Sequence, residues 1–202
     1  MTPSATNAPG TVAGIILAAG AAERMGDLKQ LLLHQGIGLL QHVVNVAEAS
    51  RLDQIVVVTG AHGDEVEASL RLERATTTRN RDFRRGNMSS LECGAKTAAD
   101  ADALILLMGD HPGMRVEVVD QMVALWIESR PWAGVTAYSD RLAQPFLLSR
   151  RALDEATALG GPKLLWRLLA EDDTGRVVHL PVEHPAPIDV NTPTDYDRLT
   201  GG

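Results

Sequence analysis

The stretch GIILAAGAAERMGDLKQLL, from Gly14 to Leu32, joins an apolar run to a loop of small residues that carries two cations. The apolar run extends from Val12 to Ala18 and is typical of a strand that is buried on both faces. The small residues after it allow backbone N–H groups to approach an anion closely. Arg24 can bind phosphate oxygens through its guanidinium fork, and Lys29 adds a compact positive charge. The stretch therefore indicates an α/β protein that holds a phosphate at the end of its first strand.

Two well-known phosphate-binding loops do not fit this spacing. A P-loop needs G-x-x-x-x-G-K-[ST], whereas Gly20 and Gly26 are one residue too far apart and Gly26 is followed by Asp27. The G-x-G-x-x-G fingerprint of dinucleotide-binding loops is also missing here. A solvated surface loop with incidental charges is the alternative. We favour a phosphate site because small residues and two cations directly follow a buried strand.

Composition limits the classes of protein that remain. The chain has 202 residues, 45% of them hydrophobic and 22% charged, which is ordinary for a folded protein with one substantial core. A net charge of −7 argues against a nucleic-acid partner, because such proteins present a basic face. No apolar run is long enough to span a bilayer, and the first residues do not resemble a signal peptide, so we expect no membrane partner and a cytoplasmic location. We expect a flexible tail over residues 1–11 and a single domain over residues 12–202.

Strand-like and helix-like segments alternate along the chain. We expect strands over residues 12–18, 54–60, 75–79, 102–110, 133–138, 144–149 and 175–181, and helices over residues 39–49, 64–72, 89–99, 116–128, 151–158 and 163–170. This order predicts a mostly parallel sheet with helices on both faces. Ligands of such sheets bind beyond the carboxyl ends of the strands. Three strand ends carry the residues of interest, namely Ala18–Gly20, Thr59–Gly60 and Gly109–Asp110.

An acidic residue ends the strand with the clearest apolar pattern. In LILLMGDHP, Asp110 follows Gly109 at the carboxyl end of that strand. A carboxylate beside a phosphate loop is a fitting ligand for Mg²⁺, which bridges phosphate oxygens. A turn or helix cap is the alternative, since Asp is common in turns.

At this point a family resemblance is clear. LAAGAAERMGDLKQLL resembles the signature L-x-A-G-x-x-x-R-M-G-x-x-K-x-L-L of nucleotidyltransferases related to the MocA-like molybdenum cofactor cytidylyltransferases. Further motifs in the same order extend the resemblance over nearly the whole chain. It implies a Rossmann-like three-layer nucleotidyltransferase fold with a mostly parallel sheet and some antiparallel pairing at one side. It also implies that Arg24 and Lys29 neutralise the triphosphate of an NTP.

The other motifs imply the remaining site residues. The GDHP segment resembles the metal-binding segment of the family, with Asp110 as a ligand, while His111 stands at a variable position and receives no role. PIDVNTPTDYDRL implies that Asp189 or Asn191 is a second metal ligand, and the resemblance favours the Asn191 position. Asn191 or Thr192 can also cap the helix that follows. RNRDFRRGNMSSLECGAK resembles a segment that holds the base and ribose. The implied catalytic residues are Arg24, Lys29 and Asp110. The implied nucleotide-binding residues are Leu17, Ala18, Ala19, Gly20, Arg24, Lys29, Gly60, Asn80, Gly86, Ser90 and Gly109.

The resemblance predicts a Mg²⁺-dependent transfer of CMP from CTP to a molybdopterin-type cofactor, with release of pyrophosphate. A molybdoenzyme of the xanthine dehydrogenase type would be the recipient. Possible acceptor-binding residues are Gln144, Pro145 and Lys163. The AAG and GDHP segments favour CTP, whereas Gln144 before Pro145 favours GTP and a guanylyltransferase.

Two other classes of function stay open. One is an NAD(P)H-dependent oxidoreductase of the nicotine blue type, against which the missing dinucleotide fingerprint counts. The other is a non-catalytic cofactor carrier. Arg24, Lys29 and Asp110 count against a carrier, because carriage alone needs no metal.

Overall fold

Seven strands form one central sheet in the order β5–β4–β1–β6–β8–β7–β9 in a computed structural model that describes residues 10–20, 25, 28–159 and 164–201. The strands are β1 Val12–Leu17, β4 Gln54–Thr59, β5 Thr76–Arg79, β6 Ala103–Met108, β7 Ala133–Ala137, β8 Leu142–Ser149 and β9 Val177–Pro181. Neighbouring strands are parallel except where β8 pairs, antiparallel, with β6 and β7. The prediction of a mostly parallel sheet with antiparallel pairing at one side is therefore confirmed.

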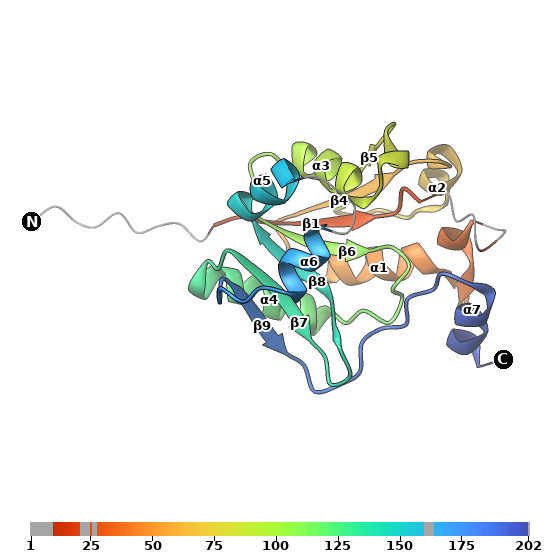
Figure 1. Cartoon of the computed structure of the whole chain (residues 1–202). Coiled ribbons are helices and arrows are strands. Elements are labelled where there is room, and N and C mark those ends of the chain that lie inside the picture. Colours follow the sequence, from red (N-terminus) through yellow and green to blue (C-terminus); the bar gives the residue numbers. More distant parts are fainter. Residues whose placement is uncertain (1–9, 21–24, 26–27, 160–163, 202) are drawn as a thin grey trace, which may run out of the picture.

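Helices cover both faces of the sheet (Figure 1). They are α1 Leu39–Ala49, α2 Gly63–Ser69, α3 Asn87–Thr97, α4 Val116–Ser129, α5 Arg150–Leu159, α6 Leu164–Ala170 and α7 Pro193–Thr200. Two short 3-10 helices, η1 Lys29–Leu31 and η2 Phe83–Arg85, precede α1 and α3. A small hairpin of β2 Leu33–His34 and β3 Ile37–Gly38 lies between η1 and α1. None of the helices in the described ranges combines the length and apolar character needed to cross a bilayer.

The side chains of β1 point alternately to the two faces of the sheet, and the core accordingly has two layers. Ala13, Ile15 and Leu17 belong to the buried cluster that contains residues of α3, α5 and α6. Val12 and Ile16 belong to the cluster that contains residues of α1 and α4. Successive side chains of a strand point to opposite faces, so each face of β1 is covered by helices. The three-layer, Rossmann-like arrangement follows from this alternation (Figure 1).

Most segment boundaries agree with the predicted ones within two residues, and two differences are larger. The helix expected over residues 64–72 ends at Ser69, because Leu70 and Leu72 leave the helix and pack, partly buried, against the core cluster under α1. The β2–β3 hairpin was not predicted, since its strands have only two residues each and carry no readable period.

Candidate functional site

The carboxyl ends of three neighbouring strands meet at one edge of the sheet. Leu17 of β1 pairs with Val58 of β4 on one side and with Met108 of β6 on the other. The Ala18 N–H donates to the Val58 carbonyl at 2.9 Å, and the Gly109 N–H donates to the Leu17 carbonyl at 3.0 Å. The residues that follow these strands therefore lie side by side, as the parallel order predicts.

Two glycines permit this close approach. A Cβ at Gly60 would lie 2.4 Å from the carbonyl oxygen of Ala19, so only glycine lets the two loops pass. A Cβ at Gly109 would lie 2.8 Å from Leu40 Cδ1 and 3.0 Å from the Leu17 carbonyl oxygen. Gly60 thus contacts the backbone at Ala19, whereas Gly109 lines the cavity described next.

A cavity of about 600 Å³ opens at these strand ends. Its walls come from the end of β1, from η1, from the loop before α3, from the end of β6 and from the segment before α7. The residues that line it are Leu17, Ala18, Ala19, Gly20, Lys29, Gln30, Phe83, Arg84, Gly86, Asn87, Ser90, Met108, Gly109, Asp110 and Asn191.

Lys29 and Asp110 form an ion pair inside this cavity. Their side chains are only 15% and 9% exposed, so the pair is largely removed from water. Lys29 Nζ contacts Asp110 Oδ2 and also donates to Asn191 Oδ1 at 2.9 Å. The structure thus brings together three predicted site residues that are far apart in the sequence.

The C-terminal segment is held beside Asp110 by the backbone and by a helix cap. The Val190 N–H donates to the Asp110 carbonyl at 3.2 Å. Thr192 caps α7 in a capping box with Asp195, whose carboxylate accepts from the Asn191 and Thr192 N–H groups. A cap at Thr192 was one of the two predicted caps, and it fixes the backbone on which Asn191 stands.

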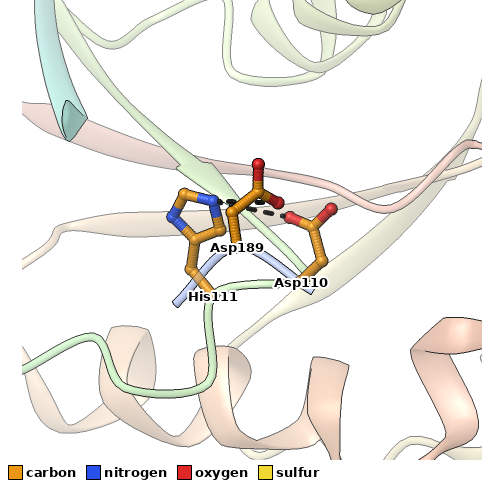
Figure 2. A group of neighbouring side chains, drawn as sticks. All are labelled: Asp110, His111 and Asp189. Atoms are coloured by element: carbon orange, nitrogen blue, oxygen red, sulfur yellow. Dashed lines mark ion pairs between the residues drawn. The ribbon is translucent and has the colours of Figure 1, made fainter. Parts of the chain in front are cut away.

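Asp110, His111 and Asp189 form a second cluster on the other side of the Asp110 carboxylate. Each offers one ligand atom, and these atoms lie within 4.8 Å of one another. Figure 2 shows the His111 ring turned toward both carboxylates. His111 Nε2 lies 3.4 Å from Asp189 Oδ1 and 3.9 Å from Asp110 Oδ1.

The Asp110 carboxylate fits a divalent cation. Among the described residues its Oδ1 atom has no hydrogen-bond partner, although it is fully buried. A buried anionic oxygen without a partner is costly, and a bound cation would remove that cost. Carboxylate oxygens are also the ligands that Mg²⁺ and similar hard cations prefer.

The environment of Asp189 favours its charged form. Partial burial raises the pKa of Asp189, but a hydrogen bond from His111 and the charges of His111 and Lys29 outweigh it. The pKa of Asp189 therefore lies below its usual value. Its side chain remains 49% exposed, so solvent can still reach this carboxylate.

Gln30 and His111 belong to the site but had no predicted role. The Gln30 side chain is buried, and its amide donates to the carbonyls of Ala18 at 3.1 Å and Gly20 at 2.9 Å. Gln30 therefore holds the backbone of Ala18–Gly20 directly after β1, and nothing in its sequence position indicates this role. The role of His111 could have been predicted from the sequence, because this histidine directly follows Asp110, a candidate metal ligand.

Of the residues predicted to hold the base and ribose, some line the cavity and one does not. Gly86 and Ser90 line the cavity, and Gly86 has a φ of 92°, which favours glycine. The buried Asn80 instead donates to the hydroxyls of Ser89 and Ser90, both at 3.0 Å. Asn80 thus ties the loop to α3 from outside the cavity.

Two of the candidate acceptor residues, Gln144 and Pro145, are described by the structure. Gln144 and Pro145 are in β8, where their carbonyls accept from the Tyr138 and Thr136 hydroxyls, both at 2.9 Å. Neither residue is among the described residues that line the cavity. Arg24 and Lys163, which the sequence also indicates, lie outside the residues that the structure describes.

Known proteins resemble this chain in sequence. Purine catabolism protein PucB of Bacillus subtilis is 27% identical over 92% of this chain and 94% of its own length. Nicotine blue oxidoreductase of Paenarthrobacter nicotinovorans is 29% identical over 69% of this chain and 67% of its own length.

Solved structures resemble it in fold. Rv0371c of Mycobacterium tuberculosis superposes with a TM-score of 0.84 at 26% identity and covers 96% of this chain and 100% of its own. The same protein has been solved in complex with manganese, with a TM-score of 0.78 at 26% identity over 95% of this chain and 99% of its own. CMP:2-keto-3-deoxy-manno-octonic acid synthetase complexed with CTP shares the fold, with a TM-score of 0.74 at 16% identity over 95% of this chain and 97% of its own.

A family model extends the comparison across most of the sheet. The model of the MobA-like NTP transferase domain matches residues 14–177, a range that includes the loop after β1, Lys29 and Asp110. Members of this family bind a nucleoside triphosphate, and nucleotidyltransferases of this kind use a divalent metal. The chain therefore belongs to the MobA-like NTP transferase family and is a nucleotidyltransferase.

Proposed function

We propose that the protein is a Mg²⁺-dependent cytidylyltransferase that transfers CMP from CTP to a molybdopterin-type acceptor and releases pyrophosphate. One observation carries this proposal. Ala18–Gly20, Lys29 and Asp110 line one cavity of about 600 Å³, and Lys29 and Asp110 form an ion pair there. A polyanion and a cation can be held together there.

Nucleotidyl transfer depends mainly on positioning and charge neutralisation, so it needs no protein nucleophile. A phosphate oxygen of the acceptor attacks the α-phosphorus of CTP. The bond from that phosphorus to the oxygen bridging the α- and β-phosphates breaks, and pyrophosphate leaves with the electron pair. Lys29 would stabilise the negative charge that builds up on the phosphate oxygens. Arg24 has the same proposed role on sequence grounds.

The cation would be held by Asp110 together with Asp189 or Asn191. When bound, it would neutralise the triphosphate and polarise its oxygens. Lys29 already occupies Asp110 Oδ2 and Asn191 Oδ1, whereas Asp189 lies with His111 on the side of the free Oδ1 atom. Of the two candidates for second ligand we therefore favour Asp189.

The choice of CTP rests on the AAG and GDHP segments, and the CTP complex of a structural neighbour is compatible with it. The name of PucB places that protein in purine catabolism. This setting is compatible with an acceptor that serves hydroxylases of the xanthine dehydrogenase type.

The test is a thermal-shift screen of CTP, GTP, ATP and NADPH, each with and without Mg²⁺, followed by a pyrophosphate-release assay with a molybdopterin acceptor. A ligand that binds only the folded state raises the melting temperature in a concentration-dependent way. We expect a shift with CTP that requires Mg²⁺, is lost in Asp110→Asn and persists in the matched control Asp173→Asn, an exposed residue. A GTP shift instead of a CTP shift would identify a guanylyltransferase.

An oxidoreductase is the second candidate, because nicotine blue oxidoreductase is 29% identical over 140 residues. Consumption of NADPH with a quinone-like dye, without a metal requirement, would favour that activity over nucleotidyl transfer. Binding of nucleotide or pterin without pyrophosphate release from any NTP would indicate a carrier.

A further inference from the structure

The two oxygens of the Asp110 carboxylate have different surroundings. Oδ2 is neutralised by Lys29, which also binds Asn191. Oδ1 has no hydrogen-bond partner in the described part of the chain, although the side chain is only 9% exposed. The two oxygens therefore differ in chemistry: the Lys29 ammonium group binds Oδ2 directly, whereas Oδ1 accepts no hydrogen bond from the described residues.

His111 and Asp189 lie on the Oδ1 side of this carboxylate (Figure 2). His111 is buried, and its Nε2 atom lies 3.9 Å from Asp110 Oδ1 and 3.4 Å from Asp189 Oδ1. Two donors that bind one cation at about 2.1 Å each can be at most about 4.2 Å apart. Both separations from the His111 nitrogen are within this limit, and the ligand atoms of all three residues lie within 4.8 Å of one another.

We propose that His111 is itself a metal ligand, so that the site presents one imidazole nitrogen and two carboxylates. This inference rests on the proposed nucleotidyl transfer at Asp110 and refines its cation. Mg²⁺ favours oxygen donors, whereas imidazole is a common ligand of divalent first-row transition metals, of which Mn²⁺ is the weakest binder. The site should therefore bind Mn²⁺ more tightly, relative to Mg²⁺, than carboxylates alone would.

Pulsed electron paramagnetic resonance of bound Mn²⁺ tests this directly, without nucleotide and without turnover. We expect nitrogen modulation of the Mn²⁺ echo that changes when the histidines are labelled with ¹⁵N. The signal should disappear in His111→Asn and remain in the matched control His179→Asn, an exposed residue on β9. In titrations, His111→Asn should weaken Mn²⁺ binding about tenfold or more and Mg²⁺ binding much less.

Several results would overturn the assignment. An Mn²⁺ echo without histidine nitrogen in the wild-type protein would exclude His111 as a ligand. Equal losses for both cations would make it a positioning residue that holds Asp189 by a hydrogen bond. Circular dichroism of His111→Asn and of a second variant, His111→Gln, controls for folding.

The test of the metal site and the test of the proposed function can give different results. Histidine-bound Mn²⁺ without pyrophosphate release from CTP would keep the metal site and remove the transferase proposal. Pyrophosphate release from CTP without histidine-bound Mn²⁺ would do the reverse.

Discussion

Lys29 connects the charge balance of the cavity with its chemistry. Among the described residues, the Lys29 ammonium group is the cation that donates a hydrogen bond to Asp110. It also donates a hydrogen bond to Asn191. With nucleotide bound, the same ammonium would lie near the phosphates, because it lines the cavity beside the loop after β1. Removing it should therefore affect both stability and turnover, for different reasons.

For Lys29→Met we expect turnover to fall by about 10²-fold or more, the usual effect of losing one positioned charge donor. In metal-free buffer, the unpaired carboxylate of Asp110 should also lower the free energy of unfolding by about 3 kcal/mol. The double variant Lys29→Met with Asp110→Asn should regain most of that stability and stay inactive. Pyrophosphate release and urea unfolding measure the two effects, with the exposed Lys96→Met on α3 as control. Full turnover in Lys29→Met would refute the role of Lys29.

At this scale the sequence allowed part of the site to be predicted. The meeting of Lys29 and Asp110 could be expected, because both residues follow strands of a parallel sheet. The approach of Asp189 to His111 could not be derived from residues alone. It depends on the path of the chain between β9 and α7 and on the Val190 hydrogen bond to Asp110.

Among the elements, α3 lies close against the sheet because a glycine faces it. A Cβ at Gly94 would lie 2.5 Å from Ile15 Cγ2 on β1 and 2.9 Å from Val58 Cγ2 on β4. Both atoms belong to β-branched side chains, which are stiff at χ1 and cannot turn aside easily. α3 also carries Ser90 on the cavity wall, so its distance from β1 affects the site.

Gly94→Ala should therefore lower the free energy of unfolding, against the usual effect of this substitution in a helix. Alanine gains about 1 kcal/mol of helix propensity, but overpacking costs about 1–3 kcal/mol, so we expect a net loss of about 1 kcal/mol. Urea denaturation measures the change, with Thr97→Ala, exposed on the same helix, as control. An increase in stability would mean that α3 can move outward at no cost.

The elements were predictable to different degrees. Long segments with a clear period, such as β6 and α4, appear close to their predicted bounds. The end of α2 was not predictable, because Leu70 and Leu72 keep an apolar pattern that tertiary packing uses outside the helix. Local pattern cannot distinguish these two uses.

Across the whole molecule, the order of strands decides which residues meet. β1 lies between β4 and β6, so the three chemically relevant strand ends are neighbours. A short turn joins β7 to β8, and such a connection requires antiparallel strands. The family resemblance implied this pairing, whereas the apolar pattern of β8 alone does not reveal its direction.

The folded molecule also lowers the pKa of carboxylates in many regions. The carboxylates concerned are Glu48, Asp140, Glu155, Asp172, Asp189 and Asp195. A carboxylate with a lowered pKa binds protons less readily in the folded state than in the unfolded chain. Its contribution to stability is present above the unfolded pKa and is lost as the pH falls through the folded pKa. The protein should therefore lose stability progressively in acid.

The loss of stability in acid can be tested at Asp172. Hydrogen bonds from the Thr174 hydroxyl and the Val177 N–H lower the pKa of Asp172 from 3.8 to about 2. These bonds hold the turn before β9, and they favour the ionised carboxylate. Asp172→Asn should therefore lower the melting temperature near neutral pH, and its difference from the wild type should shrink as the pH falls from about 4 to about 2. Calorimetry across this range measures the difference, with the exposed neighbour Asp173→Asn as control. A difference that stays constant with pH would show that shape, rather than charge, explains the effect, because a neutral contact does not respond to protons.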